Sequence, residues 1–223
     1  MASRMVIALV GLGPAALPHL RSLQDLNDRI ELRYAFARDP RVDRIQPYTG
    51  PVRLTDSLEL ILQDHEVQAV IVATPASTHL EICERCFAAG KHVLLEKPIE
   101  LNLERATRLL ELATLAGLQL GVVLQHRFRQ ASQVLQKLLM DGRLGEVQAA
   151  SVRVPWWRSQ AYYNEPGRGT FARDGSGVLL TQAIHTLDLF RALVGVQSVK
   201  SAVVRQHNYT KWKLRIMSVR CWF

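Results

Sequence analysis

The feature that most constrains this chain is a glycine-rich turn directly after its first apolar run. Residues 5–10 read MVIALV and residues 11–16 read GLGPAA, so a G-x-G-x-x-A pattern stands between an expected buried strand and an expected helix. Gly11 permits a tight turn, Gly13 lets the backbone approach a pyrophosphate, and Ala16 keeps the helix close to the strand. The helix N-terminus would face the negative charge. The pattern predicts a dinucleotide-binding site, and an ordinary glycine-rich turn is the alternative.

Apolar runs alternate with helical spacings over the first 125 residues. We expect strands at residues 5–10, 30–37, 68–74, 92–96 and 119–124, and helices at residues 17–26, 57–63, 77–89 and 103–116. Strands that alternate with helices in this way form a parallel sheet covered on both faces, with right-handed crossovers. The expected fold class is α/β, with an N-terminal doubly wound parallel sheet of the Rossmann type followed by a second, incomplete α+β domain.

The pattern changes after about residue 127. Here we expect a helix at residues 134–140, a strand of an antiparallel sheet at 146–154, a long polar and aromatic loop at 155–177 and a helix at 178–193. At about 150 residues per domain, 223 residues leave room for one domain and part of another. We expect a dinucleotide-binding domain over residues 1–125, a partial α+β domain over 126–210 and an irregular basic tail over 211–223.

Charge and composition exclude several classes of partner. The net charge is +8, but seven of the basic residues and no acidic residue follow Asp188, so the main body is balanced and nucleic acid is not an expected partner. No apolar run nears the roughly 18 residues of a membrane span, so we expect a cytoplasmic protein that does not bind membranes. Cys83 and Cys86 share a helical stripe with apolar residues, which favours reduced core thiols, and no metal is expected.

The end of the second expected strand is where the adenosine ribose would be recognised. The sequence there is Ala37-Arg38-Asp39, and Asp39 precedes Pro40 and so leaves the strand. An arginine at this point favours a ribose 2′-phosphate, whereas an acidic side chain would accept a hydrogen bond from a 2′-hydroxyl. Arg38 therefore favours NADP over NAD, and a solvated surface arginine is the alternative.

Polar groups also follow two later strands, at the sheet edge where open α/β sheets bind ligands. They are Thr74-Pro75 with His79, and Glu96-Lys97-Pro98. A lysine at such a position can transfer protons if its surroundings lower its pKa, and a surface lysine at a strand end is the alternative.

The last expected helix carries a third polar group. Thr181 and His185 are four residues apart and share a helix face, and Asp188 can reach the same side. His185 is either a structural histidine or an acid beside a substrate hydroxyl.

Together these motifs resemble the Gfo/Idh/MocA oxidoreductases. The resemblance rests on the GLGPAA turn, Thr74-Pro75 with His79, AGKHVLLEKP at residues 89–98, His126-Arg127-Phe128 and GVLLTQAIHTLDL at 177–189, and it covers about residues 4–206. It implies an NAD(P)-dependent enzyme that transfers hydride between nicotinamide and a secondary alcohol or ketone of a cyclic polyol, sugar or dihydrodiol.

The resemblance also implies residue roles. Lys97 and His185 match the catalytic pair, and a small-molecule substrate would contact Lys97, Arg168, Thr181 and His185. The cofactor would contact Gly11, Gly13, Ala16, Arg38, Thr74, Pro75, His79, Glu96, Lys97 and Arg127. Thr181 stands where the family commonly has Asp, which would place more of the proton transfer on Lys97. The loop and helix motifs look closest to members that act on dihydrodiols.

Family members normally continue for several more strands after a segment such as residues 198–206. The resemblance therefore implies a C-terminally truncated chain, for which the homo-oligomer usual in the family is doubtful. The alternative to an enzyme is a non-catalytic NAD(P)-binding sensor or an inactive truncated paralogue.

Overall fold

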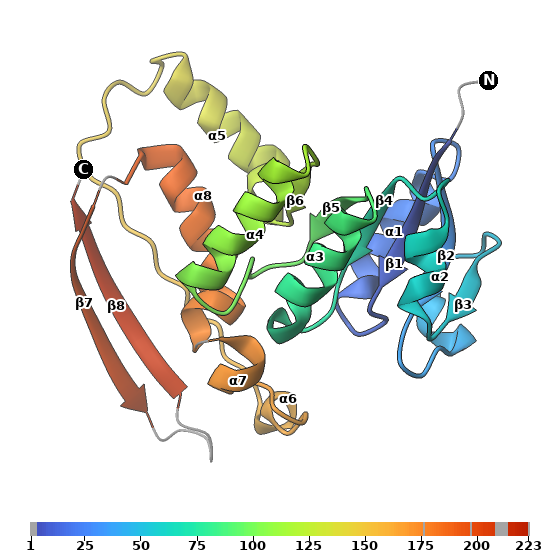
Figure 1. Cartoon of the computed structure of the whole chain (residues 1–223). Helices are drawn as coiled ribbons and strands as arrows, with labels where there is room; N and C mark the ends of the chain where they lie inside the picture. Colours follow the sequence, from blue (N-terminus) through green and yellow to red (C-terminus); the bar gives the residue numbers. More distant parts are fainter. Residues whose placement is uncertain (1–3, 176, 197, 208–213, 223) are drawn as a thin grey trace. The chain divides into compact units, whose positions relative to one another are not determined.

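A six-stranded, wholly parallel sheet organises the first 123 residues (Figure 1). The computed structural model describes residues 4–175, 177–196, 198–207 and 214–222, and it divides the chain into two units, Met1–Val123 and Leu124–Phe223. The sheet order is β3-β2-β1-β4-β5-β6. The strands are β1 (Met5–Val10), β2 (Ile30–Phe36), β3 (Arg53–Thr55), β4 (Ala69–Val72), β5 (His92–Leu95) and β6 (Leu120–Val122).

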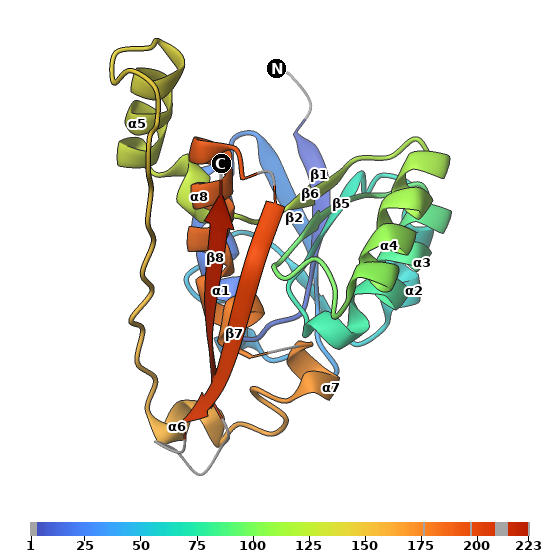
Figure 2. The same ribbon diagram turned by 90° about the vertical axis from the view of Figure 1, so that its left-hand side faces the viewer.

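Helices cover both faces of this sheet. They are α1 (Ala16–Asp25), α2 (Leu58–Gln63), α3 (His79–Ala88) and α4 (Leu103–Leu115), with short turns η1 (Val42–Ile45) and η2 (Ala76–Thr78). Figure 2 shows α2, α3 and α4 on one face and α1 on the other. Successive side chains of a strand point to opposite faces, so Leu9 of β1 packs with Leu20 of α1, whereas Val10 packs with Phe87 of α3. The prediction of a doubly wound parallel sheet is confirmed.

The two N-terminal-unit cysteines belong to this core, as predicted. Cys83 and Cys86 lie on the buried side of α3 and are fully inaccessible to solvent. Burial raises the pKa of the Cys86 thiol to about 12 and also raises that of Cys83. Both thiols therefore stay protonated near neutral pH and serve as small core residues.

One strand of the sheet was not expected from the sequence. Strand β3 pairs with the end of β2 through Tyr34, Ala35 and Phe36. It contains three residues and forms an edge of the sheet, so it is too short to show a two-residue hydrophobic period.

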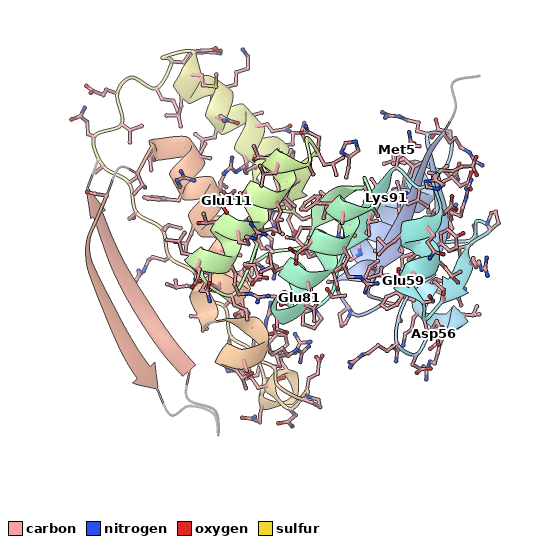
Figure 3. All side chains as sticks on the ribbon, viewed as in Figure 1. Met5, Asp56, Glu59, Glu81, Lys91 and Glu111 are labelled. Atoms are coloured by element: carbon pink, nitrogen blue, oxygen red, sulfur yellow. The ribbon has the colours of Figure 1, made fainter. Side chains whose placement is uncertain are left out.

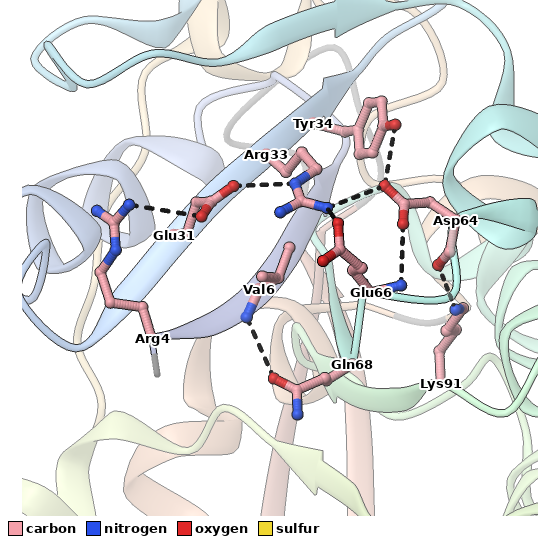
Figure 4. A network of polar contacts seen from close by, with 9 residues as sticks. All are labelled: Arg4, Val6, Glu31, Arg33, Tyr34, Asp64, Glu66, Gln68 and Lys91. Carbon is pink, nitrogen blue, oxygen red and sulfur yellow. Dashed lines mark hydrogen bonds and ion pairs between the residues drawn. The ribbon is translucent and has the colours of Figure 1, made fainter. Parts of the chain in front are cut away.

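A polar network joins the strands at their amino-terminal edge (Figure 4). The Arg33 guanidinium donates to Glu31 (2.9 Å), Asp64 (3.4 Å) and Glu66 (2.6 Å). Lys91, which is 2% exposed, donates from Nζ to the Asp64 carbonyl at 2.6 Å. These contacts tie β2, the turn before β4 and the turn before β5 together. The charged groups at this edge are thus occupied with one another, on the side of the sheet away from the predicted ligand-binding edge.

The second unit consists mainly of helices joined by extended chain. It contains η3 (Gln125–Phe128), α5 (Gln130–Met140), α6 (Gln160–Tyr163), α7 (Phe171–Asp174), the π-helical turn η4 (Leu179–Ala183) and α8 (Ile184–Val194), followed by β7 (Ser198–His207) and β8 (Leu214–Trp222). The helices expected at 134–140 and 178–193 are present, the second with a π-helical first turn. Two short helices interrupt the loop expected at 155–177.

Two expectations for the second unit are wrong. Residues 146–154 form no strand, because a strand needs a hydrogen-bonded neighbour and the strands described in this unit, β7 and β8, pair with each other. The tail was expected to be irregular, but it contains β8. The backbone of β8 pairs antiparallel with β7, with Ser198 opposite Trp222 at one end and His207 opposite Leu214 at the other. Backbone pairing does not need a hydrophobic period, so the sequence pattern alone did not indicate this strand. Residues 211–213 and 223 of that tail lie outside the described residues.

One stretch passes a simple test for a membrane span. Ala172–Val194 has 23 residues and contains an 18-residue window with a mean hydropathy of 1.2, which by length and composition alone could cross a bilayer, whereas no apolar run near this length was expected from the sequence. One such stretch is a weak indication, because core helices of soluble proteins meet the same criteria. It also carries buried His185 and the ion-paired Asp188, which are costly groups inside a bilayer.

Helices α3 and α4 are held together by one buried carboxylate, Glu100, whose side chain is 0% exposed. It accepts hydrogen bonds from the backbone N–H groups of Leu80 (2.8 Å) and Leu101 (2.7 Å) and from Arg105 Nε (2.9 Å). Burial by itself raises the pKa of Glu100, but these hydrogen bonds outweigh it and hold the pKa below its ordinary value. The ionised Glu100 therefore stabilises the fold fully when the pH is above the pKa that Glu100 has in the unfolded chain. This stabilisation is lost as the pH falls through the lower pKa that Glu100 has in the folded chain.

We predict that Glu100→Ala lowers the free energy of unfolding by about 3 kcal/mol, because it leaves two part-buried backbone N–H groups without their acceptor and removes one of the two carboxylates that bind Arg105. Glu81→Ala is the matched control, since Glu81 binds the same Arg105 from the surface (Figure 3) with its side chain 60% exposed. We expect it to cost less than about 1 kcal/mol. Urea unfolding at pH 7 and pH 4 measures the free energy of unfolding of both variants. Equal losses for Glu100→Ala and Glu81→Ala would contradict the role of Glu100 as the buried acceptor that joins α3 and α4.

Candidate functional site

The site begins where the carboxyl ends of β1 and β4 touch. Gly11 follows β1 with φ +100°, and a Cβ atom added there would lie 2.8 Å from the Ala73 carbonyl and 2.9 Å from Thr74 Cγ2. Its N–H donates to the Phe36 carbonyl at 2.9 Å. A side chain at position 11 is therefore excluded by the fold itself. Because the strand order reverses between β1 and β4, this is the point where doubly wound sheets bind their ligands.

Gly13 differs from Gly11, because a Cβ atom added to it would meet nothing within 4 Å. Its carbonyl accepts from the N–H of Ala16 at 2.9 Å and so begins α1, with Ala16 1% exposed against the sheet. No side chain caps this helix N-terminus, and its first turn has no acidic residue. The open backbone at Gly13 and the uncapped N–H groups of a ten-residue helix fit a pyrophosphate.

The Thr74-Pro75 turn after β4 is braced from behind by His79. This imidazole is 0% exposed, with Nε2 3.0 Å from the Thr74 carbonyl and Nδ1 3.3 Å from the Ile99 carbonyl. Burial lowers the pKa of His79, which favours the neutral ring. Thr74 itself is half-buried and accepts from the Thr78 hydroxyl at 2.8 Å. His79, expected as a cofactor contact, thus lies behind the turn and presents no atom to a ligand there.

Glu96 and Lys97 follow β5, the strand next to β4. Glu96 is 9% exposed, and Lys97 is half-buried and joined to Pro98 by a cis peptide bond. Oε2 of Glu96 accepts from the Lys97 backbone N–H at 3.2 Å. Its Oε1 accepts from Nε2 of His19, on α1, at 2.8 Å. Glu96, expected to contact the cofactor, is thus bonded inside the protein beside Lys97.

His19 is the residue at this edge that the sequence reasoning missed. It lies three residues after Ala16 on α1, so it faces the sheet with Ala16 and Leu20. That spacing was the available signal, but a partner 77 residues away does not show in a local pattern.

Arg38 lies just beyond β2 with an exposed side chain. Asp39 is exposed as well and lies 4.0 Å from Arg44. Within the part of the chain that the structure describes, Arg38 makes no hydrogen bond or ion pair, so its guanidinium is open to an anionic ligand.

In the second unit, α8 brings His185 beside His126 of η3. The two ring centroids are 5.2 Å apart, and Trp156 approaches the His126 ring edge-on at 6.2 Å. Both histidines are 5% exposed. Burial lowers the pKa of His126, and Arg129 lowers it further. His126 was part of a recognised motif but was not selected as a site residue, because its nearness to His185 depends on the packing of η3 against α8.

Asp188 and Arg127 form a two-point ion pair between the same two elements. Arg127 donates from Nε and Nη2 to the two carboxylate oxygens of Asp188, and this contact raises the pKa of Arg127. Arg127 was expected to contact the cofactor and Asp188 to share a face with His185. In the second unit the two hold η3 on α8, which positions His126 beside His185.

The two remaining predicted substrate residues also have internal contacts. Arg168 bonds Glu165 through Nε at 2.7 Å and lies 4.4 Å over the Tyr162 ring. Thr181 lies in the π-helical turn η4 and donates to the Gly177 carbonyl at 3.3 Å. Turns of this kind are frequent at functional sites. Among the described residues, no group of three or more His, Cys, Asp or Glu side chains is placed to hold a metal ion.

Comparison with known proteins identifies relatives of this chain among curated dehydrogenases. The myo-inositol 2-dehydrogenase of Thermotoga maritima is 27% identical over 191 residues, covering 86% of this chain and 55% of that protein. The 1-carboxy-3-chloro-3,4-dihydroxycyclohexa-1,5-diene dehydrogenase of Comamonas testosteroni is 31% identical over 195 residues, covering 85% of this chain and 47% of that protein. The chain spans about half the length of the curated relatives it matches.

A solved structure shares the fold. The WlbA dehydrogenase of Bordetella pertussis, in complex with NADH and UDP-GlcNAcA, superposes with a TM-score of 0.84 at 29% identity, covering 99% of this chain and 64% of that one. Residues 5–124 match the oxidoreductase family with an NAD-binding Rossmann fold, and residues 132–213 match the GFO/IDH/MocA C-terminal domain. The chain therefore belongs to the Gfo/Idh/MocA oxidoreductase family.

Proposed function

We propose that this chain is an NAD(P)-dependent oxidoreductase that acts on a secondary alcohol or ketone of a cyclic polyol, sugar or dihydrodiol. The observation that carries the proposal is the shared sheet edge. Gly11 packs directly on Thr74 after β4, and Lys97 follows the neighbouring strand β5. A dinucleotide bound at Gly13 would therefore lie at the same edge of the sheet as Lys97.

The residues present fit a dinucleotide. The open backbone at Gly13 and the uncapped N-terminus of α1 would hold the pyrophosphate, and Thr74 would line the edge beside it. Arg38 would meet the adenosine ribose, where its exposed guanidinium favours a 2′-phosphate and hence NADP. When bound, the cofactor supplies the hydride acceptor or donor.

Lys97 would hold and move the proton. In the reducing direction its ammonium group would donate a proton to the substrate oxygen whose carbon gains hydride, and in the oxidising direction its neutral amine would accept the proton of the hydroxyl whose carbon loses hydride. As the family resemblance implies, His185 would polarise a substrate oxygen and Thr181 would hydrogen-bond a substrate hydroxyl; within the second unit, the His126 ring lies beside His185. A threonine carries no charge, so the net proton transfer would fall on Lys97.

The names of the relatives support the substrate class. One relative is named for myo-inositol, one for a dihydroxycyclohexadiene, and a third, from Escherichia coli, is a D-glucoside 3-dehydrogenase that is 27% identical over 215 residues. All three names describe a six-membered ring bearing hydroxyls. A ring with adjacent secondary hydroxyls is accordingly the substrate we propose.

A matched glycine pair tests the cofactor site. Gly13→Val should weaken NADPH and NADH binding at least about tenfold, or about 1.4 kcal/mol, and leave the thermal melting temperature unchanged, because the added side chain meets only the open space of the site. Gly11→Ala should lower the melting temperature as well, since its Cβ collides with Ala73. Fluorescence titration measures the affinity of each variant for the cofactor, and thermal melts measure its melting temperature. Full affinity in Gly13→Val would contradict the dinucleotide assignment.

The cofactor preference is tested at the end of β2. Arg38→Ala should weaken NADPH binding about tenfold while changing NADH binding by less than about twofold, because only NADPH carries the 2′-phosphate. Arg41→Ala is the control, since Arg41 is exposed in the same loop but engaged by Asp43 at 2.7 Å. Equal losses for the two cofactors would show that Arg38 does not read the phosphate.

Turnover is tested at Lys97. Lys97→Met should lower kcat about 100-fold on a reactive polyol or dihydrodiol and leave cofactor affinity nearly intact, as expected when general acid–base catalysis is removed. A panel of inositols, glucosides and dihydrodiols, assayed by NAD(P)H absorbance, provides the measurement. A variant that keeps most of its kcat would exclude Lys97 as the proton-transfer group. Cofactor binding without turnover on any panel member would favour a non-catalytic NAD(P)-binding sensor.

A further inference from the structure

We propose that His19 is a positioning residue for Lys97, which it controls through the carboxylate of Glu96. The proposal rests on the function proposed above, in which Lys97 transfers the proton. It links the helix that begins at the dinucleotide turn to the strand end that carries the lysine, and it gives a role to a histidine outside the expected catalytic pair.

The contacts form a continuous chain. Nε2 of His19 donates to Oε1 of Glu96 at 2.8 Å, and Oε2 of the same carboxylate accepts from the Lys97 N–H at 3.2 Å. Both side chains of the His19–Glu96 pair are only 11% exposed. An ionised carboxylate can only accept hydrogen bonds, so the histidine must be the donor at Nε2. Among the described residues, each oxygen of Glu96 thus has one hydrogen-bond partner, His19 of α1 for Oε1 and the Lys97 backbone N–H for Oε2.

The two ends of this chain are separately anchored. The Glu96 N–H donates to the Val72 carbonyl at 2.9 Å, which fixes the Glu96 backbone to β4. Leu20 and Leu23 of α1 are 0% and 3% exposed, which fixes the helix on the sheet. The freedom that remains is rotation of the Glu96 carboxylate about its side-chain bonds. His19 removes that freedom, and the Lys97 N–H then has an acceptor in a fixed place.

Loss of the His19 hydrogen bond would change the position of the Glu96 carboxylate. If His19 could no longer donate, Glu96 would lose a charge-assisted hydrogen bond and turn toward water or toward the Lys97 ammonium. Either movement takes the acceptor away from the Lys97 backbone and changes the charge beside the side chain. An effect of this kind acts on the proton-transfer step and leaves Gly13 and the pyrophosphate cradle as they are.

Three substitutions at one position separate this role from simple packing. His19→Phe keeps the ring and removes the donor. His19→Gln places a side-chain N–H at about the reach of Nε2, while His19→Asn stops short of it. If the phenylalanine variant fails to fold, the glutamine and asparagine pair tests the same contact. His65→Phe is the matched control, since His65 is an exposed histidine of the same unit.

The first measurement needs no turnover. Amide hydrogen exchange at Lys97, followed by NMR on the whole chain, should be at least tenfold faster in His19→Phe and His19→Asn than in the unaltered protein. His19→Gln and His65→Phe should exchange at the unaltered rate. The exchange rate at Lys97 can be measured even if the chain is inactive. Failure of the proposed function and failure of the positioning role are therefore distinguishable. Unchanged exchange in both His19→Phe and His19→Asn would overturn the proposal.

The second measurement uses the active protein. His19→Phe should lower kcat five- to tenfold with less than twofold change in NAD(P)H affinity, and His19→Gln should restore kcat. In a Lys97→Met background, His19→Phe should have no further effect, because the group it positions is gone. An equal loss of kcat in both backgrounds, or a loss of cofactor affinity that matches the loss of kcat, would overturn the proposal.

Discussion

The contact between Gly11 and the end of β4 is the constraint on which the N-terminal unit depends. A Cβ atom at position 11 would lie 2.8 Å from the Ala73 backbone, so β1 and β4 can end side by side only because position 11 has no side chain. That closeness brings the Thr74 turn against Gly11, and α1 begins a few residues later, where the Gly13 carbonyl accepts from the Ala16 N–H. The same helix then carries His19 to Glu96, the residue before Lys97.

The two edges of the sheet have opposite roles. At the amino-terminal edge, Arg33 and its carboxylate partners satisfy one another and tie strands together. At the carboxyl edge, Gly13 leaves open backbone and Arg38 is exposed, while the buried Glu96 and His79 hold the turns from behind. Polar groups that are mutually bonded stabilise the fold, and polar groups left facing outward are the ones available to a ligand. This division supports a ligand site at the carboxyl edge.

In the second unit, internal bonding likewise places a candidate site residue. The Arg127–Asp188 pair holds η3 on α8, and the His126 ring then lies against His185. Residues predicted as ligand contacts thus prove to be of two kinds. Gly13 and Arg38 are exposed, whereas His79, Glu96 and Arg127 are hydrogen-bonded within their own units.

Local patterns in the sequence determined the doubly wound sheet, the glycine turn and the strand-end positions of Thr74 and Lys97, because each depends on residues within one strand, one turn or one helix. They did not indicate β3, and they predicted a strand at 146–154 that the structure lacks, since a strand exists only where a partner backbone is available. The tertiary structure alone decided the His19–Glu96 and His126–His185 pairs. Their members are 77 and 59 positions apart, and only the packing of helices on the sheet and of η3 on α8 brings such distant side chains within reach.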